Sequence, residues 1–330
     1  MKKVLGMGNA LVDVLMQIEN DEVLQELNLP KGSMQLVNKE MAAEVYDKAG
    51  KKGSIKASGG SAANTIHALA SLGIKTGFIG KVGRDEWGNF FKNDMEISNI
   101  NTLLMESDSE SGRAMALISP DSERTFATFL GAAVELNAQD LVENSFIGYH
   151  YFHIEGYLVQ NRDLIEEALK LAHKNGLKIS LDLASFNVVE ENLDFLHSMV
   201  SKYVDILFAN KEEARSFTGG LEGEAALNWM SELSEIVILK QGVQGSMLKH
   251  NNQIIKISPV KVDALDTTGA GDLYAAGFIY GLLHSLPLHK CGEIGSYLSA
   301  KIIEVIGPKM DIQTWKEVYA EVQKIATKNL

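Results

Sequence analysis

The chain contains a single cysteine, Cys291, among its 330 residues. One cysteine cannot form an intramolecular disulfide, and it excludes a metal site built from several thiolates. This composition is typical of proteins from a reducing compartment. We therefore expect the protein to be cytoplasmic.

Long apolar runs are also lacking. The longest uncharged apolar stretch, Leu273–Leu283, is far shorter than the roughly 20 residues that an α-helix needs to span a bilayer. The start Met1-Lys2-Lys3 is followed by apolar residues as in a signal peptide, but Asp13 interrupts them and no small-residue cleavage site follows. The sequence predicts a soluble protein with no membrane partner.

Positive charge is in deficit, because 31 lysines and arginines stand against 43 aspartates and glutamates, a formal net charge of −12. Such a surface repels nucleic acid, so we expect no nucleic-acid partner. Small anions can still bind, since a pocket lined by N–H groups overrules net charge locally. With 45% hydrophobic residues, the chain can bury the core of one large domain or of two unequal ones.

Three common catalytic motifs are absent from the sequence: the Gly-x-x-x-x-Gly-Lys-Ser/Thr phosphate loop, the Gly-x-Ser-x-Gly nucleophile elbow and the His-Glu-x-x-His zinc motif. Gly6-x-Gly8 is only part of a dinucleotide-binding fingerprint, because Leu11 stands where the third glycine is required. A nicotinamide-dependent dehydrogenase is thus a weak alternative. The other interpretation is that these glycines let one strand bend into the next and expose Asn9 and Asp13 beside a pocket.

What the sequence does contain is a glycine-rich stretch, Asp266-Thr267-Thr268-Gly269-Ala270-Gly271-Asp272, directly before an apolar helix. Backbone N–H groups in such a loop can approach an anion closely, because few Cβ atoms obstruct them. The helix adds unpaired N–H groups and the positive end of its dipole. Asp272 would then take a proton from a hydroxyl group that attacks a phosphoryl group. The alternative is an ordinary glycine turn with Asp272 as a helix cap.

A second glycine loop, Gly59-Gly60-Ser61-Ala62-Ala63-Asn64, opens another small-residue helix. Gly59, Gly60 and Asn64 can meet sugar hydroxyl groups through their backbone and amide groups. The alternative is that the small residues simply let the helix pack closely on a sheet.

From residue 149 onward, predicted strands alternate with predicted helices. The strands are expected at 149–154, 178–183, 206–209 and 236–239. This alternation predicts a parallel sheet with helices on both faces, whose ligands bind beyond the carboxyl ends of the strands. The residues expected at that edge are Asp182, Asn210, Glu213 and Gly242.

Short strands predicted at 103–106, 112–119 and 125–130, together with residues 13–37, indicate a small sheet set apart from the main body. Arg124 begins one of these strands, where it would reach a phosphate or form a surface ion pair. We expect a discontinuous lid of residues 13–38 and 103–131, and a main domain of residues 1–12, 39–102 and 132–330.

Four motifs together resemble those of the ribokinase-like (PfkB) carbohydrate kinases. The two glycine loops resemble the two signatures of that family, Asn210–Glu213 is similar to its Asn-x-x-Glu motif, and Val82–Gly88 is similar to its VGxDxxG turn. Within the family, the likeness is greatest to adenosine kinases. The segments that carry it are Gly6–Asp13, Ile154–Leu158 and Val204–Asn210. Ala10 and Thr268 depart from that pattern, since many adenosine kinases have proline at the first position and some have asparagine at the second.

The resemblance implies an α/β fold with a doubly wound, mostly parallel sheet flanked by helices, and a small β-sheet lid. It implies ATP-dependent phosphoryl transfer to the 5′-hydroxyl of a nucleoside, adenosine to AMP in purine salvage. ATP and Mg²⁺ are the expected cofactors, with K⁺ as a further candidate. A sugar kinase of the same family, acting on ribose or another pentose or hexose, is the alternative. An inactive ligand-sensing homologue is less favoured because Asp272 and its glycines are intact, and the lid would also suit a homodimer interface.

The resemblance also implies roles for individual residues. Asp272 would act as the general base, while the N–H groups of Gly269, Ala270 and Gly271 would form an anion hole. The expected substrate-binding residues are Asn9, Asp13, Gly59, Gly60, Asn64 and Tyr157, the last as the aromatic that packs on the purine. The expected nucleotide-binding residues are Asn210, Glu213, Gly242 and Thr267. Glu213 would help to hold Mg²⁺ through water, and Asp266 and Thr268 would face a monovalent cation.

Overall fold

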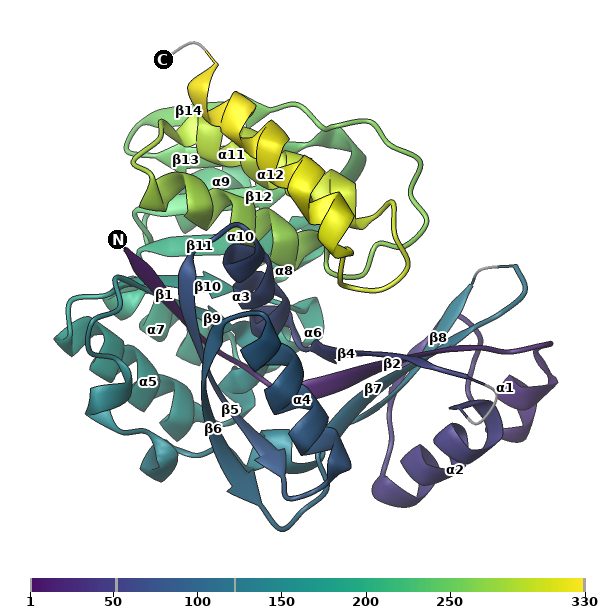
Figure 1. The fold of residues 1–330 in the computed structure, drawn as a ribbon. Helices are drawn as coiled ribbons and strands as arrows, with labels where there is room; N and C mark the ends of the chain where they lie inside the picture. The colour runs from purple at the N-terminus through teal and green to yellow at the C-terminus, as the bar shows by residue number, and fades with distance from the viewer. Residues whose placement is uncertain (1, 51–52, 122, 329–330) are drawn as a thin grey trace.

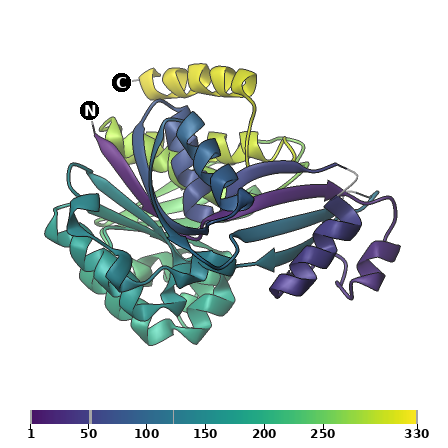
Figure 2. The ribbon, with the colours of Figure 1, turned by 60° about the horizontal axis from the view of Figure 1, so that its bottom comes forward.

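The computed structural model describes residues 2–50, 53–121 and 123–328. Within these ranges the strands form two sheets, one of nine strands and one of five. Figures 1 and 2 show the small sheet, with its own two helices, projecting from the layered main body. No helix in the described ranges is both long and apolar enough to cross a membrane.

The large sheet is parallel from β12 to β6, whereas β13 and β14 are added antiparallel at one edge. Its strands, in order across the sheet, are β14 (Gln253–Ile257), β13 (Ser246–His250), β12 (Ile236–Lys240), β11 (Ile206–Asn210), β10 (Lys178–Asp182), β9 (Tyr151–Glu155), β1 (Lys3–Met7), β5 (Lys75–Gly83) and β6 (Ile100–Ser107).

Buried side chains alternate between the two faces of this sheet. On β11, Ile206 and Phe208 belong to one apolar core, and Leu207 and Ala209 belong to the other. Burial on both faces is typical of a parallel sheet covered by helices on each side. The first core includes α3 (Ser61–Ser71), α4 (Glu86–Ile97), α10 (Ala270–Leu283), α11 (Leu288–Ile302) and α12 (Ile312–Thr327). The second includes α5 (Arg162–Lys174), α6 (Phe186–Glu191), α7 (Leu193–Tyr203), α8 (Lys211–Phe217) and α9 (Gly223–Met230). The predicted doubly wound fold is confirmed.

The small sheet forms the lid. Its strands, in order, are β3 (Met34–Leu36), β8 (Arg124–Phe129), β7 (Gly112–Ile118), β2 (Leu11–Gln17) and β4 (Ile55–Gly59). Helices α1 (Glu22–Glu26) and α2 (Lys39–Ala49) accompany it, and α2 contacts β7 and β8. Short 3-10 helices lie at Gly131–Glu135, Ala138–Asp140, Glu143–Ser145, Gly156–Gln160 and Gly242–Gln244.

Three elements lie in a different part of the fold from the one that we expected. The strand predicted at 103–106 is β6, which pairs parallel with β5 in the large sheet rather than in the lid. Conversely, β4 pairs antiparallel with β2 and belongs to the lid sheet, and α2 packs on the lid. Short strands look alike in sequence whichever sheet they join, so the division of the chain at residues 39 and 103 was misplaced for these elements.

Candidate active site

A cavity of about 1210 Å³ lies between the lid and the carboxyl edge of the large sheet. Four neighbouring strands each contribute their last residue to its wall: Glu155 of β9, Asp182 of β10, Asn210 of β11 and Lys240 of β12. This edge of a doubly wound sheet is where ligands bind in such folds. The cavity is large enough for two small ligands, since single-ligand pockets measure roughly 300–1,000 Å³.

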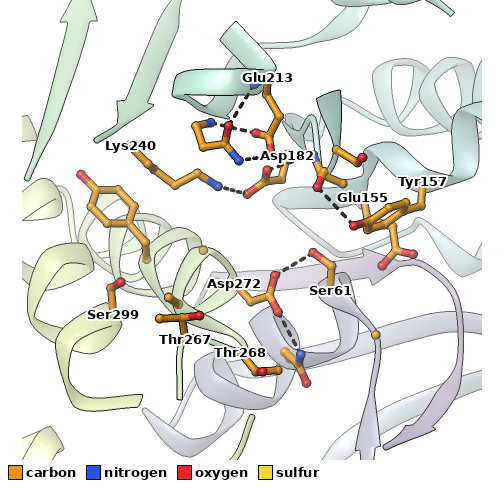
Figure 3. A pocket seen from close by; sticks show the side chains of 18 of the residues that line it. Ser61, Glu155, Tyr157, Asp182, Glu213, Lys240, Thr267, Thr268, Asp272 and Ser299 are labelled. Carbon is orange, nitrogen blue, oxygen red and sulfur yellow. Dashed lines mark hydrogen bonds and ion pairs between the residues drawn. The ribbon is translucent and has the colours of Figure 1, made fainter. Parts of the chain in front are cut away.

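Asp272 lies in the first turn of α10 and points into this cavity (Figure 3). Ser61 Oγ donates to its Oδ1 at 2.7 Å, and Asn64 Nδ2 donates to its Oδ2 at 2.9 Å. Burial raises the pKa of Asp272 to about 6, although the hydrogen bonds from Asn64 and Ser61 act in the opposite direction. The helix is capped by Gly269, with no side-chain cap, so the alternative interpretation of Asp272 as a helix cap is wrong.

The glycine loop before α10 differs from the expected anion hole in one respect. Gly269 has the left-handed φ of 78° that favours glycine, and it does not line the cavity. The Ala270 N–H already donates to the Thr267 carbonyl oxygen at 3.2 Å. Among the described residues, the N–H groups of Gly269, Gly271 and Asp272 have no acceptor, and of these three residues Gly271 and Asp272 line the cavity. Of the three expected donors, Ala270 is therefore the one already engaged, and the two free N–H groups at the cavity wall belong to Gly271 and Asp272. The anion hole remains a prediction.

Asp266 stands behind this loop, outside the cavity wall. Its Oδ1 accepts from the Thr268 N–H at 2.9 Å and its Oδ2 from the Gly307 N–H at 2.6 Å. The guanidinium of Arg124, from the lid strand β8, forms an ion pair with Oδ1. Arg124 therefore bridges lid and main body through a buried carboxylate instead of forming a surface pair. A monovalent cation at Asp266 and Thr268 remains a prediction, and it would have to share this carboxylate with Arg124.

Asn9, which also lines the cavity, is held by a buried carboxyl group that sequence reasoning missed. Glu155 Oε1 accepts from the Asn9 backbone N–H at 2.9 Å and from Nδ2 at 2.8 Å, and Oε2 accepts from the Ala62 N–H at 2.9 Å. Burial raises the pKa of Glu155 to about 7, against the effect of these hydrogen bonds. A Cβ atom on Gly8 would lie 2.3 Å from Glu155 Oε2. The glycine of the partial fingerprint thus serves close packing, which counts against the dehydrogenase alternative.

Asp13 enters the cavity from the lid strand β2. Burial raises its pKa to about 7, while the nearby ammonium group of Lys309 opposes this shift. A Cβ atom on Gly59 would lie 2.2 Å from Asp13 Oδ2, and one on Gly60 would lie 2.1 Å from the Asn9 carbonyl oxygen. Gly60 also has a φ of +100°. Both glycines therefore leave room for neighbouring groups. Gly60 also lines the cavity, whereas Gly59 does not.

Asn210 and Glu213 form a reciprocal cap at the start of α8. Asn210 Oδ1 accepts from the Glu213 N–H at 2.9 Å, and Glu213 Oε2 accepts from the Asn210 N–H at 2.8 Å. Burial raises the pKa of Glu213 to about 7, with Lys240 lowering it and Asp182 raising it. Among the described residues no cluster of three or more metal-ligating side chains is present. The acidic groups at this edge fit Mg²⁺ held mainly by waters and substrate phosphates, which is how that ion usually binds.

The remaining predicted residues also lie in the wall of the cavity. Tyr157 exposes 37% of its surface there and donates its hydroxyl to the Ala184 carbonyl oxygen at 3.2 Å. Gly242, Thr267 and Thr268 line the cavity as well. Besides Glu155, sequence reasoning missed Ser61 and Lys240, whereas it had placed Asp182 at this edge. For Glu155 and Lys240 the available signal was their position just after the end of a predicted strand, and Ser61 stands inside the glycine loop Gly59–Asn64.

A partly buried carboxylate with a raised pKa, free N–H groups at a helix N-terminus beside it and a large cavity suit the transfer of a phosphoryl group to a small molecule. The chain belongs to the pfkB family of carbohydrate kinases, whose sequence profile matches residues 36–315. The predicted membership and enzymatic class are thus confirmed.

Relatives of this chain carry two kinds of name. The solved structure of adenosine kinase from Sinorhizobium meliloti is 30% identical, with a TM-score of 0.86 over 97% of this chain and 99% of that one. That of a probable sugar kinase protein from Rhizobium etli CFN 42 is 29% identical, with a TM-score of 0.86 and the same coverages of 97% and 99%. A curated 5-dehydro-2-deoxygluconokinase from Clostridium botulinum (strain Eklund 17B / Type B) is 29% identical over 279 residues, 79% of this chain and 82% of that protein.

Proposed function

We propose that this kinase transfers the terminal phosphoryl group of ATP to the 5′-hydroxyl of a nucleoside, with adenosine as the first candidate. The observation that carries the proposal is the apolar wall that the lid presents to the cavity. Met34 and Leu36 of β3 line it while 57% and 63% exposed, and Phe126 lines it from β8. A purine would cover this surface, whereas a free sugar offers little apolar area to do so.

Polar groups that line the same cavity favour the binding of a ribose ring. The amide oxygens of Asn9 and Asn64 are buried and have no hydrogen-bond partner within the described part of the chain. Both residues line the cavity, as does Asp13. Buried acceptors are normally satisfied, and the hydroxyl groups of a ribose would donate to them.

The proposed chemistry follows from this arrangement. The Asp272 carboxylate accepts the proton of the attacking hydroxyl group. At the same time the hydroxyl oxygen bonds to phosphorus, and the bond between phosphorus and the ADP oxygen breaks. The N–H groups of Gly271 and Asp272 stabilise the negative charge on the transferring group. When bound, Mg²⁺ would neutralise phosphate charge, and Glu213 is the carboxyl group available to its water shell.

The test is ADP release with ATP and Mg²⁺ across adenosine, inosine, ribose, fructose and 5-dehydro-2-deoxygluconate. Adenosine is expected to give the highest kcat/KM. Leu36→Ser should raise KM for adenosine by about tenfold, because covering a leucine side chain is worth about 1.5–3 kcal/mol, and should leave KM for ribose unchanged. Ile97→Ser is the matched control, since Ile97 is 81% exposed and lies outside the cavity wall.

The second candidate is a sugar kinase, which the names of the Clostridium and Rhizobium relatives favour. Rapid turnover of a free sugar or sugar acid, with no turnover of adenosine, would overturn the nucleoside proposal and support this one. A cytoplasmic location and a homodimer through the lid remain predictions. Light scattering of the purified protein tests the dimer.

A further inference from the structure

Lys240 is a basic side chain of the cavity wall that lies beside Gly271 of the glycine loop. It is the last residue of β12, and its side chain crosses the end of β11 to Asp182, the last residue of β10 (Figure 3). The two side chains are only 15% and 6% exposed, and the Nζ–Oδ2 distance is 2.6 Å. Both residues line the cavity. This ion pair is therefore part of the cavity wall and not of the solvent-facing surface.

The ammonium group faces the point where α10 begins. A Cβ atom placed on Gly271 would lie 3.1 Å from Lys240 Nζ, and no other atom is as near to that position. Gly271 carries one of the two free N–H groups described above. The absence of a side chain at Gly271 thus lets a fixed positive charge stand beside an anion-binding backbone.

The charges around Lys240 keep its ammonium group protonated, and not all of its N–H donors are used. Burial lowers the pKa of the ammonium group, but the carboxylates of Asp182 and Glu213 more than offset this, so that the pKa lies above its ordinary value. An ammonium group has three N–H donors. Within the described part of the chain, Asp182 is its only hydrogen-bond partner. Two donors remain for a ligand.

We propose that Lys240 is a catalytic residue that contacts the transferring phosphoryl group, with Asp182 as the positioning residue that aims it. Phosphoryl transfer depends mainly on positioning and on stabilising charge at the equatorial oxygens. The chain has no lysine-bearing phosphate loop, and Lys240 supplies an equivalent charge from the end of a strand. The lysine keeps its proton throughout, since the hydroxyl proton passes to Asp272. The inference rests on the proposed phosphoryl-transfer site and is independent of the acceptor.

The alternative is that Lys240 only neutralises Asp182, and a pair of variants separates the two. Lys240→Met leaves the Asp182 carboxylate without its partner, whereas the double variant Lys240→Met with Asp182→Asn removes both charges. If Lys240 contacts the phosphoryl group, both variants should lose about 10²–10³-fold in kcat, as when one oxyanion donor is removed. Lys240→Arg, which keeps the charge, should lose less. Recovery of near-normal kcat in the double variant would overturn the proposal.

A binding measurement gives the second readout. Calorimetry with ADP and Mg²⁺, with and without aluminium fluoride as a mimic of the planar phosphoryl group, separates nucleotide binding from charge stabilisation. Lys240→Met should bind ADP within a few-fold of wild type and lose the extra affinity that the fluoride confers. Unchanged fluoride-dependent affinity would refute the contact. Asp272→Asn, tested in parallel, should keep that extra affinity, so a failure of the base assignment is distinguishable from a failure of the Lys240 assignment.

Discussion

Burying the ionised carboxylate of Asp272 lowers the stability of the folded protein. The variant Asp272→Asn should remove both this cost and the catalytic activity. General-base catalysis contributes about 10²–10⁴-fold, so we predict that Asp272→Asn lowers kcat by at least that factor. The same variant should make the folded protein more stable above pH 6. A carboxylate that is kept buried for its role as a base predicts both effects, a lower kcat and a higher stability. Replacing a buried residue of purely structural role would lower stability instead.

The magnitude comes from the pKa. Burial raises the pKa of Asp272 from 3.8 to about 6, and each pKa unit corresponds to about 1.36 kcal/mol. Since the folded pKa lies above the unfolded one, stability is greatest below pH 4 and falls as pH rises to about 6. Asparagine does not ionise and escapes this loss, which sets a gain of at most about 3 kcal/mol. Its amide can still accept from Asn64 and donate to Ser61 Oγ.

The assay is urea unfolding of wild type and Asp272→Asn at pH 4 and pH 8, beside kcat at saturating substrates. The variant should gain stability over wild type at pH 8 and show little difference at pH 4. Asp194→Asn, at an exposed carboxylate in the first turn of α7, is the control for losing a charge. The acid limb of the wild-type rate profile should lie near pH 6 and move to higher pH in Ser61→Ala, which loses a hydrogen bond that lowers the pKa. Near-normal kcat in Asp272→Asn, or equal destabilisation at both pH values, would refute the reasoning.

Three further outcomes test the surroundings of the site. Gly60→Ala should lower stability by about 1–3 kcal/mol, measured by thermal unfolding, because its Cβ atom would lie 2.1 Å from the Asn9 carbonyl oxygen. Lys309→Met should lower the urea midpoint by an amount equivalent to about 1.5–3 kcal/mol, since its ammonium group is mostly buried against an aspartate of α4. In Arg124→Met, Asp266 loses its guanidinium partner, and we expect kcat to depend more steeply on K⁺ than in wild type. An identical response to K⁺ and to tetramethylammonium in both proteins would speak against a cation site there.

The sequence was sufficient to predict the doubly wound fold, because two-sided burial and strand–helix alternation are local patterns. The two glycine loops were also predictable from sequence, because each is a continuous stretch of the chain. The Asn210–Glu213 cap was predictable because its two residues stand three positions apart. Sheet membership was not predictable in the same way. β4 and β6 are short strands whose partners are decided by the path of the chain in space, and nothing in their composition distinguishes a lid strand from a central one.

The pairs that complete the site were hidden for a related reason. Lys240 and Asp182 stand 58 residues apart, and Ser61 and Asp272 stand 211 apart. Lys240 and Asp182 meet because β10 and β12 flank β11 in the sheet, and Ser61 and Asp272 meet because α3 packs against α10. Once the order of the strands is known, the last residues of neighbouring parallel strands must share one edge. The topology, more than any single motif, therefore determines which charged groups act together.

The topology also explains how a chain with a formal charge of −12 can handle a polyanionic phosphate donor. Four cavity carboxyl groups have pKa values raised to about 6 or 7 by burial: Asp13, Glu155, Glu213 and Asp272. Near neutral pH these groups are partly protonated, so the cavity carries less negative charge than its composition indicates. Lys240 and the free N–H groups of α10 are concentrated at the loop where a phosphoryl group would lie. The acidic surface then repels larger polyanions, while Lys240 places positive charge at the loop where the phosphoryl group would lie.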